Sequence, residues 1–303
     1  MDEAEQALVG FLKDCAAQTE LVDASQQRRV RCETCNASRS LYCFDCLRLL
    51  LPRKHWPPSL LDGSFRLPFG VDLVLDDKRA ASTGVQVATL LHCRAGLADA
   101  CGFRLIDVER GDTIPSYDDD DSRDQQEEDI FLLFPGPSSV SLSSVVPETE
   151  TRCMPDDASS PRRMRLVVLD CKWTKSSLRL HPSLACLRQV HLDPVPQRGY
   201  FWRWHSMPGE GRLSTVEAIY WSAWTTGRAM DWNEERLTSL LTLLWLFGWQ
   251  RQAITKRYEQ DASLPPHLPF TEDGKEYQRE LRRRKGKGEH TEADDVASSR
   301  WAA

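Results

Sequence analysis

Four cysteines near the N-terminus fall into two Cys-x-x-Cys pairs, Cys32 with Cys35 and Cys43 with Cys46, with seven residues between the pairs. Four thiolates can surround Zn²⁺ tetrahedrally at about 2.3 Å, and a full set of protein ligands leaves no position open for catalysis. The pattern therefore predicts a structural zinc knuckle. Two pairs of reduced cysteines without a metal, or a redox-active pair, are the alternatives, and two adjacent pairs favour the metal.

A second group of candidate residues follows apolar runs of the kind that form buried strands. Residues 130–134 are followed by Pro135 and Gly136, and residues 164–169 are followed by Asp170. In a parallel sheet, ligands bind beyond the carboxyl ends of the strands. We therefore expect Phe134-Pro135-Gly136 and the segment from Asp170 to Trp173 to border a binding site. The alternatives are a helix N-cap for Asp170 and a place in the core for Trp173.

The segment Ser214-Thr215-Val216-Glu217 has the form of a capping box, with Ser214 at the N-cap and Glu217 reaching back to it. That structural role alone would account for both residues. The first turn of such a helix also presents free N–H groups that attract a carboxylate or a phosphate. Ser214, Thr215 and Glu217 are therefore candidates for anion binding as well as for capping.

These residues need strands and helices to position them, and the hydrophobic pattern predicts both. Strands are expected at 65–75, near 105–106, at 130–134, at 164–169 and around 190–192. Helices are expected at 3–20, after Ser82 and Thr83, from Ser214 to about Trp224, and over 234–258. Apolar strands separated by helices predict an α/β fold with a mostly parallel sheet covered on both faces.

The net charge of −6 over 303 residues is unevenly distributed. Residues 107–129 carry 11 acids and two arginines, a local charge of −9, whereas residues 279–288 carry +5. The total charge therefore does not exclude an RNA partner. No run approaches the roughly 18 apolar residues of a membrane span, and the acidic N-terminus is unlike a secretory signal. We expect a nuclear or cytoplasmic protein with reduced cysteines.

Five motifs together resemble the DTW-domain proteins, which are tRNA-uridine aminocarboxypropyltransferases. Asp170-Cys171-Lys172-Trp173 resembles the family's Asp-x-Thr-Trp signature, and the segment YCFDC (42–46) is similar to the knuckle of one eukaryotic branch. The runs IFLLFPGP (130–137), YFWR (200–203) and LSTVEAIY (213–220) resemble further elements of that branch, in the same order. The similarity covers residues 30–260. Lys172 departs from the pattern, because the family has a threonine there.

The resemblance implies a SPOUT-like fold with a C-terminal trefoil knot that binds S-adenosylmethionine. It implies transfer of the 3-amino-3-carboxypropyl group to N3 of a tRNA uridine, in the D-loop, with release of methylthioadenosine. Asp170 would then accept the uridine proton or hold the donor's ammonium group, and Trp173 would pack against adenine or the base. The other residues implied at the donor site are Phe134, Pro135, Gly136, Lys172, Ser214, Thr215 and Glu217, and Arg203 would contact tRNA phosphate.

The expected organisation is an N-terminal helix (1–29), a four-cysteine zinc knuckle (30–62), a catalytic domain (63–262) and a basic, disordered tail (263–303). The catalytic domain would contain an acidic loop at 107–129 and a flexible insert at 137–163. Two other functions fit the same pocket. One is a SPOUT-type RNA methyltransferase, and the other is an RNA-binding module whose catalytic site has decayed at Lys172. The sequence assigns no oligomeric state.

Overall fold

The protein is built around one six-stranded sheet. The computed structural model describes residues 3–21, 29–117, 128–151, 163–171, 181–196, 199–201 and 213–260, with Glu276, Glu280 and Arg283. The strands are β5 (Gly70–Asp76), β6 (Phe103–Asp107), β7 (Glu128–Leu133), β8 (Val140–Ser141), β9 (Arg163–Cys171) and β10 (Arg188–His191). Their order is β6-β5-β9-β7-β10-β8, and every neighbouring pair is parallel. The predicted α/β fold with a parallel sheet is confirmed.

Parallel pairing explains why the central strands are apolar on both faces. Leu73, Val74 and Leu75 of β5 have no exposed surface, and Leu166 and Val167 of β9 are equally buried. Strand β9 comes late in the sequence, yet it lies between β5 and β7. Its register places Asp170 opposite Leu75 of β5. The carboxyl ends of β5 and β9 therefore meet at one edge of the sheet.

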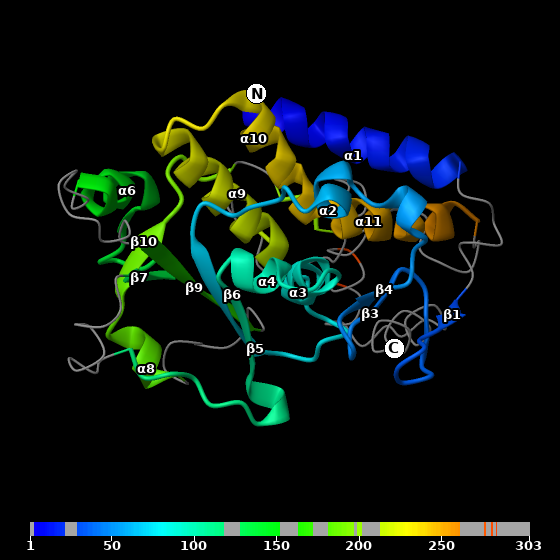
Figure 1. Ribbon diagram of the computed structural model, residues 1–303, viewed down its shortest axis with the longest axis horizontal. Helices are drawn as coiled ribbons and strands as arrows, with labels where there is room; N and C mark the ends of the chain where they lie inside the picture. Colours follow the sequence, from blue (N-terminus) through cyan, green and yellow to red (C-terminus); the bar gives the residue numbers. More distant parts are fainter. Residues whose placement is uncertain are drawn as a thin grey trace.

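Helices gather mainly on one face of this sheet, as Figure 1 shows. They are α1 (Glu3–Leu21), α2 (Pro58–Asp62), α3 (Gly84–His92), α4 (Leu97–Ala100), α6 (Leu142–Thr151), α9 (Thr215–Ala229), α10 (Glu234–Ser239) and α11 (Trp245–Gln260). Short 3-10 helices are η1 (Arg53–His55), η2 (Val108–Arg110) and η3 (Leu240–Leu244). The opposite face carries α8 (Pro182–Ala185) and a smaller core formed by Val74, Leu132, Val167 and Leu184. Both faces are covered, as predicted.

The N-terminal part of the chain forms two small units. Helix α1 lies along α11, with Leu8, Leu12 and Cys15 buried, as Figure 1 also shows. After it come two antiparallel pairs, β1 (Val30–Arg31) with β2 (Ser38–Arg39), and β3 (Tyr42–Cys43) with β4 (Arg48–Leu49). We call residues 30–49 the Cys knuckle. It packs beside α3 through β4.

Three predicted segments differ in detail from the structure. The strand expected at 65–75 begins only at Gly70, because Pro68 lacks the N–H that a sheet ladder needs. The helix expected over 234–258 is confirmed as one continuous helical run from Glu234 to Gln260, but its middle part, η3, has 3-10 geometry between α10 and α11. The first part of the insert expected at 137–163 contains β8 and α6, whose Leu142, Val145 and Val146 are buried at helical spacing.

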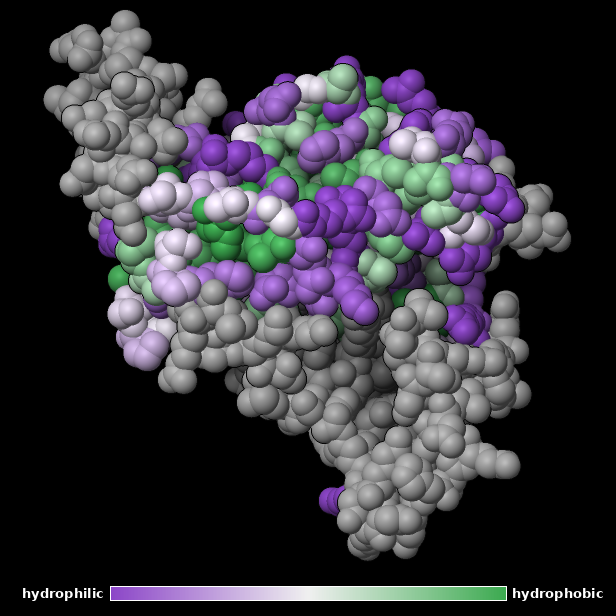
Figure 2. All heavy atoms as spheres, turned by 90° about the horizontal axis from the view of Figure 1, so that it is seen from below, coloured by the Kyte–Doolittle hydropathy of each residue, from purple (hydrophilic) through white to green (hydrophobic). Residues whose placement is uncertain are grey.

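The described surface is polar. Figure 2, which views the molecule from below, shows apolar side chains as small groups between hydrophilic ones on the coloured part of that face. Among the described residues, the large hydrophobic side chains that are exposed are Val30, Leu61 and Val195. No described helix has the length and apolarity that crossing a membrane requires. The acidic stretch 118–127 and nearly all of the basic tail lie outside the described residues.

Candidate functional site

Asp170 lies at the carboxyl end of β9 and joins three parts of the chain. Its Oδ2 accepts a hydrogen bond from the Ser82 hydroxyl at 2.5 Å and another from the Gly84 N–H at 3.2 Å. The Thr215 hydroxyl is also hydrogen-bonded to this carboxyl group. The side chain is buried. Asp170 therefore connects the end of β9 to the start of α3 and to the start of α9.

The approach of α3 to Asp170 depends on a glycine. A Cβ on Gly84 would lie 2.7 Å from Asp170 Oδ2 and within 3.0 Å of two carbons of Leu73. Ser82 has a double role, because its Oγ also accepts the Val85 N–H at 3.0 Å. The expected helix start at Ser82 and Thr83 is confirmed, with Thr83 at the N-cap of α3. Asp170 accepts an N–H at the start of α3, a helix 86 residues earlier in the sequence, whereas the segment to which its N-cap alternative refers lies outside the described residues.

Burial raises the pKa of the Asp170 carboxyl, and the hydrogen bonds from Ser82, Thr215 and Gly84 oppose this change. Removal from water penalises the charged form, whereas donors that point at it favour the charged form. The amino ends of α3 and α9 also favour the charged form of this carboxyl group, since helix N-termini carry partial positive charge. This carboxyl group is therefore held where it can take up a proton more readily than an exposed aspartate.

The start of α9 is a capping box, as predicted. Glu217 is fully buried, and its Oε2 accepts the Ser214 N–H at 2.9 Å and the Ser214 hydroxyl at 2.6 Å. Its Oε1 accepts the Tyr200 N–H at 2.6 Å, which fixes the chain before the helix. The Val216 N–H lies 3.3 Å from the Thr83 Oγ1 that accepts its hydrogen bond. Burial raises the pKa of Glu217, and the bonds from Ser214 and Tyr200 oppose that.

These hydrogen bonds reduce the number of backbone N–H groups at the start of α9 that are free to bind an anion. The Ser214 N–H is engaged by Glu217 and the Val216 N–H by Thr83. Within the described contacts, the Thr215 N–H is the donor left in this turn, and the Thr215 side chain already touches Asp170. Asp170, Thr215, Ser214 and Glu217 are thus brought together, and a ligand would meet Thr215 first.

The turn Phe134-Pro135-Gly136 lies at the same sheet edge but on the other face. The Phe134 side chain packs against the smaller core with Leu169, whereas Val168 and Asp170 point to the helix-covered face. A Cβ on Gly136 would collide with Gln189 Oε1, so the turn lies close against β10. Within the described residues, the Phe134 and Asp170 side chains are not in contact. A ligand that touched both segments would have to extend across the carboxyl ends of the strands from one face of the sheet to the other.

Lys172, Trp173 and Arg203 lie outside the described residues. An acid–base pair that the sequence did not suggest lies nearby: His181 Nε2 is 3.2 Å from Asp76 Oδ2, at the carboxyl end of β5. Asp76 pairs in register with Cys171 of β9. The two residues are 105 positions apart, so no local sequence pattern could have indicated the pair.

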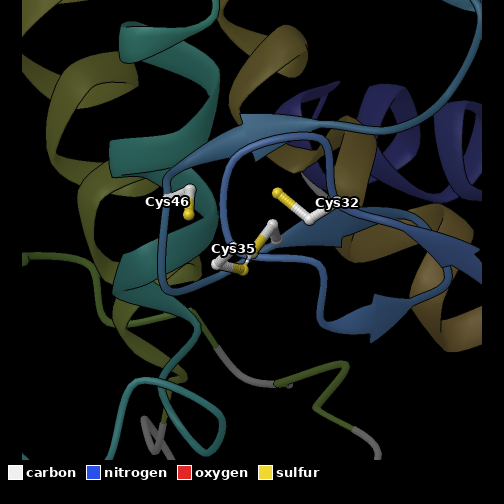
Figure 3. A group of neighbouring side chains, drawn as sticks. Cys32, Cys35 and Cys46 are labelled. Atoms are coloured by element: carbon white, nitrogen blue, oxygen red, sulfur yellow. Dashed lines mark hydrogen bonds between the residues drawn. The ribbon is translucent and has the colours of Figure 1, made fainter.

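The four cysteines of the two Cys-x-x-Cys pairs form one cluster. Their Sγ atoms lie within 4.8 Å of one another, and those of Cys35 and Cys43 are 3.6 Å apart. A tetrahedron with Zn–S bonds of about 2.3 Å has edges of about 3.8 Å, so the cluster fits such an ion. Figure 3 shows the thiols of Cys32, Cys35 and Cys46 approaching one another. Desolvation and the neighbouring thiols raise the pKa of Cys46 to about 12, a penalty that a bound dication would remove.

The Cys knuckle is joined to the sheet edge by a chain of ionic contacts. Arg79, in the loop between β5 and α3, donates from Nε to Asp107 Oδ2 at 2.6 Å and from Nη1 to the Asp45 carbonyl at 2.9 Å. Arg110 bonds the Asp45 carboxylate at 2.6 Å, and Arg39 bonds its other oxygen at 2.8 Å. Arg79 stands three residues before Ser82. The knuckle is therefore attached to the loop that holds Asp170.

The model of the DTW domain family matches residues 86–246, which is more than half of the chain. The chain belongs to the DTW-domain family. The match contains Asp170 and the capping box of α9, whereas the Cys knuckle lies outside it. The predicted family is confirmed.

Several curated relatives agree with this assignment, and each is named tRNA-uridine aminocarboxypropyltransferase 1. The Xenopus laevis protein is 23% identical over 68% of this chain and 74% of its own length. The Rattus norvegicus protein is 25% identical over 73% of this chain and 76% of its own length, and the Homo sapiens protein is 23% identical over 68% and 71%. No solved structure matches the chain.

Proposed function

We propose that this DTW-domain protein transfers the 3-amino-3-carboxypropyl group of S-adenosylmethionine to N3 of a uridine in tRNA, in the D-loop. The observation that carries the proposal is the family match across the end of β9 and the start of α9, together with relatives named for this activity. A nuclear or cytoplasmic location belongs to the same proposal.

The reaction needs a proton acceptor and strict positioning. The sulfonium of the donor makes the attached γ-carbon electrophilic, and a pocket must present that carbon rather than the methyl group to the base at about 3–3.5 Å. The N3–H proton leaves uridine, the N3–Cγ bond forms, and the Cγ–S bond breaks with its electron pair going to sulfur. The products are the modified uridine and methylthioadenosine.

Two groups at the carboxyl ends of the strands are suited to accept the proton from uridine N3. Asp170 has a raised pKa, and a general base works best when its pKa approaches the working pH. The same carboxyl group is placed to hold the donor's ammonium instead. The pair Asp76–His181 is a second candidate acceptor, since the carboxylate 3.2 Å from Nε2 orients the imidazole ring. We assign the first place to Asp170, because it lies within the family match and Asp76 does not.

We assign the remaining roles as the resemblance to the family implies. The Thr215 N–H, at the positive end of α9, would hold the donor's carboxylate, with Ser214 and Glu217 fixing that turn. The backbone of Phe134-Pro135-Gly136 would approach the adenosine, and Trp173 would pack against adenine or the base. Lys172 would contact the donor carboxylate or a tRNA phosphate, and Arg203 a tRNA phosphate. The trefoil knot stays a prediction.

We also propose that Cys32, Cys35, Cys43 and Cys46 bind one structural Zn²⁺. The spacing of their sulfur atoms supports this, because it matches the tetrahedral set that the ion prefers. Four thiolate ligands would leave no site for water or substrate on the metal. The ion would hold the knuckle together and take no part in the transfer.

A pair of labelled donors tests the transfer directly. Purified protein is incubated with unmodified tRNA and S-adenosylmethionine labelled either in the carboxyl carbon or in the methyl group. We expect only the carboxyl label to reach tRNA, and we expect Asp170→Asn to reduce its incorporation by at least a hundredfold while binding tRNA normally. The variant His181→Gln distinguishes the two candidate proton acceptors. If it reduced incorporation of the carboxyl label more than Asp170→Asn does, His181 would be the general base.

The opposite label would identify a different enzyme. Methyl label in tRNA would establish a methyltransferase in place of the proposed activity. Incorporation of neither label, with tRNA still bound, would favour the decayed RNA-binding module.

A further inference from the structure

A cavity lies away from Asp170, between the Cys knuckle and the end of α3. Its volume is about 840 Å³, and its walls come from β1, β4, η1 and the residues that follow α3. Four arginines line it, Arg31, Arg48, Arg53 and Arg94, against one acid, Glu33. A chain with a net charge of −6 therefore concentrates positive charge in this groove. We call it the arginine groove.

We propose that the arginine groove binds the phosphate backbone of the tRNA substrate and so positions the target uridine at Asp170. This inference rests on the proposed function. Arginine guanidinium groups match phosphate oxygens through pairs of N–H donors, and backbone contacts dominate the affinity of proteins for nucleic acids. The four arginines, rather than the apolar residues between them, therefore suggest the ligand of this groove.

The guanidinium groups are available for such contacts. Within the described part of the chain, no acid pairs with Arg31 or Arg53, and Arg53 lies 5.5 Å above the ring of Trp56. The Trp56 ring is itself held by a bond of 2.9 Å from its Nε1 to the Leu51 carbonyl. Arg53 is thus presented on a fixed aromatic surface.

The other two arginines keep donors free. Arg48 pairs with Glu33 at 3.1 Å, but both side chains are largely exposed, and such a surface pair contributes at most about 1 kcal/mol. Arg94 gives one N–H to the Leu61 carbonyl at 2.8 Å, and a guanidinium has five in all. Neither contact removes the positive charge from the groove wall.

Helix α3 connects the groove to the candidate site. Its first residue, Gly84, touches Asp170, and its last, His92, lines the groove. At about 1.5 Å per residue, these nine residues place the groove roughly 13 Å from Asp170. That is about four base steps along a nucleic-acid strand at about 3.4 Å each. A tRNA bound at Asp170 can therefore reach the groove with phosphates close to its target uridine.

Charge reversal tests the arginine groove. The double variant Arg31→Glu/Arg53→Glu is compared with Lys13→Glu/Arg257→Glu, which makes the same change in net charge at positions that do not line the groove. Arg31→Gln/Arg53→Gln removes the charge without adding repulsion. Affinity for an unmodified tRNA transcript is measured by fluorescence anisotropy across a salt series, with thermal unfolding and calorimetric binding of S-adenosylmethionine as checks on the fold.

We expect the groove reversal to weaken tRNA binding at least tenfold and to make the salt dependence shallower by about two units, since each phosphate contact contributes about 0.7–0.9. The control should change affinity less than threefold, and donor binding should persist in all variants. Equal tRNA affinity in the groove and control variants would overturn the proposal. A wild-type protein that transfers no group to tRNA would refute the proposed function, whereas loss of tRNA binding in the groove variants would still support the groove.

Discussion

At the scale of single residues, the carboxyl end of β9 is organised by contacts that are short in space and distant in sequence. Asp170 was identifiable because it follows a buried strand, and Ser214 with Glu217 because a capping box is a local pattern. Their partners Ser82 and Gly84 were not identifiable as site residues, since the contacts span 88 and 86 positions. Sequence patterns report what a residue does within its own element, and only the fold shows what it meets.

Gly84 gives a prediction at this scale. Gly84→Ala would place a Cβ 2.7 Å from Asp170 Oδ2 and against Leu73, so either the loop before α3 or the end of β9 must move. We expect a loss of about 1–3 kcal/mol in the free energy of unfolding, the usual result of overpacking. Chemical denaturation measures it, and donor binding should weaken in the same variant.

Gly10→Ala is the matched control. Gly10 lies inside helix α1, and a Cβ there would have no heavy atom within 4 Å. We expect that variant to be more stable, by up to about 1 kcal/mol, because alanine favours a helix over glycine. If both substitutions changed stability alike, the close contact at Gly84 would not be the cause.

At the scale of elements, Arg79 connects the Cys knuckle to the carboxyl end of β6. Its guanidinium joins Asp107 of β6 to the carbonyl groups of Phe44 and Asp45 between two of the cysteines. The sequence predicted the knuckle but not this attachment, because Arg79 carries no pattern that distinguishes it from a surface arginine. The spacing of the leucines likewise predicted the continuous helical run at 234–258, but not the 3-10 geometry of η3 within it.

Removal of the proposed Zn²⁺ should therefore loosen more than the knuckle. We expect Cys43→Ser to abolish zinc binding in elemental analysis and to lower the unfolding temperature. Amide hydrogen exchange should accelerate in residues 30–49 and also in residues 77–83, which Arg79 anchors. Cys186→Ser, at an exposed cysteine outside the cluster, is the control. This coupling would be contradicted if the wild-type protein kept its unfolding temperature after zinc was removed. It would also be contradicted if amide hydrogen exchange accelerated only in residues 30–49.

At the scale of the whole molecule, charge is segregated and the functional features lie around α3. Asp170 meets the amino end of that helix, and the arginine groove begins at its other end. The net charge of −6 does not indicate this groove with four arginines, because the acidic sequence at 107–129 outweighs their positive charge in the total. The fold class and the family could be predicted from strand patterns and motifs. The groove could not, because its arginines come from four separate segments.

We propose that this family member aims the amino-acid arm of S-adenosylmethionine at a tRNA uridine. Mass spectrometry of nucleosides tests it most directly, on tRNA from cells with the gene, without it, and without it but supplied with Asp170→Asn. We predict a uridine carrying the aminocarboxypropyl group in the first sample and its loss in the other two. The same modified uridine at equal abundance in all three would contradict the account.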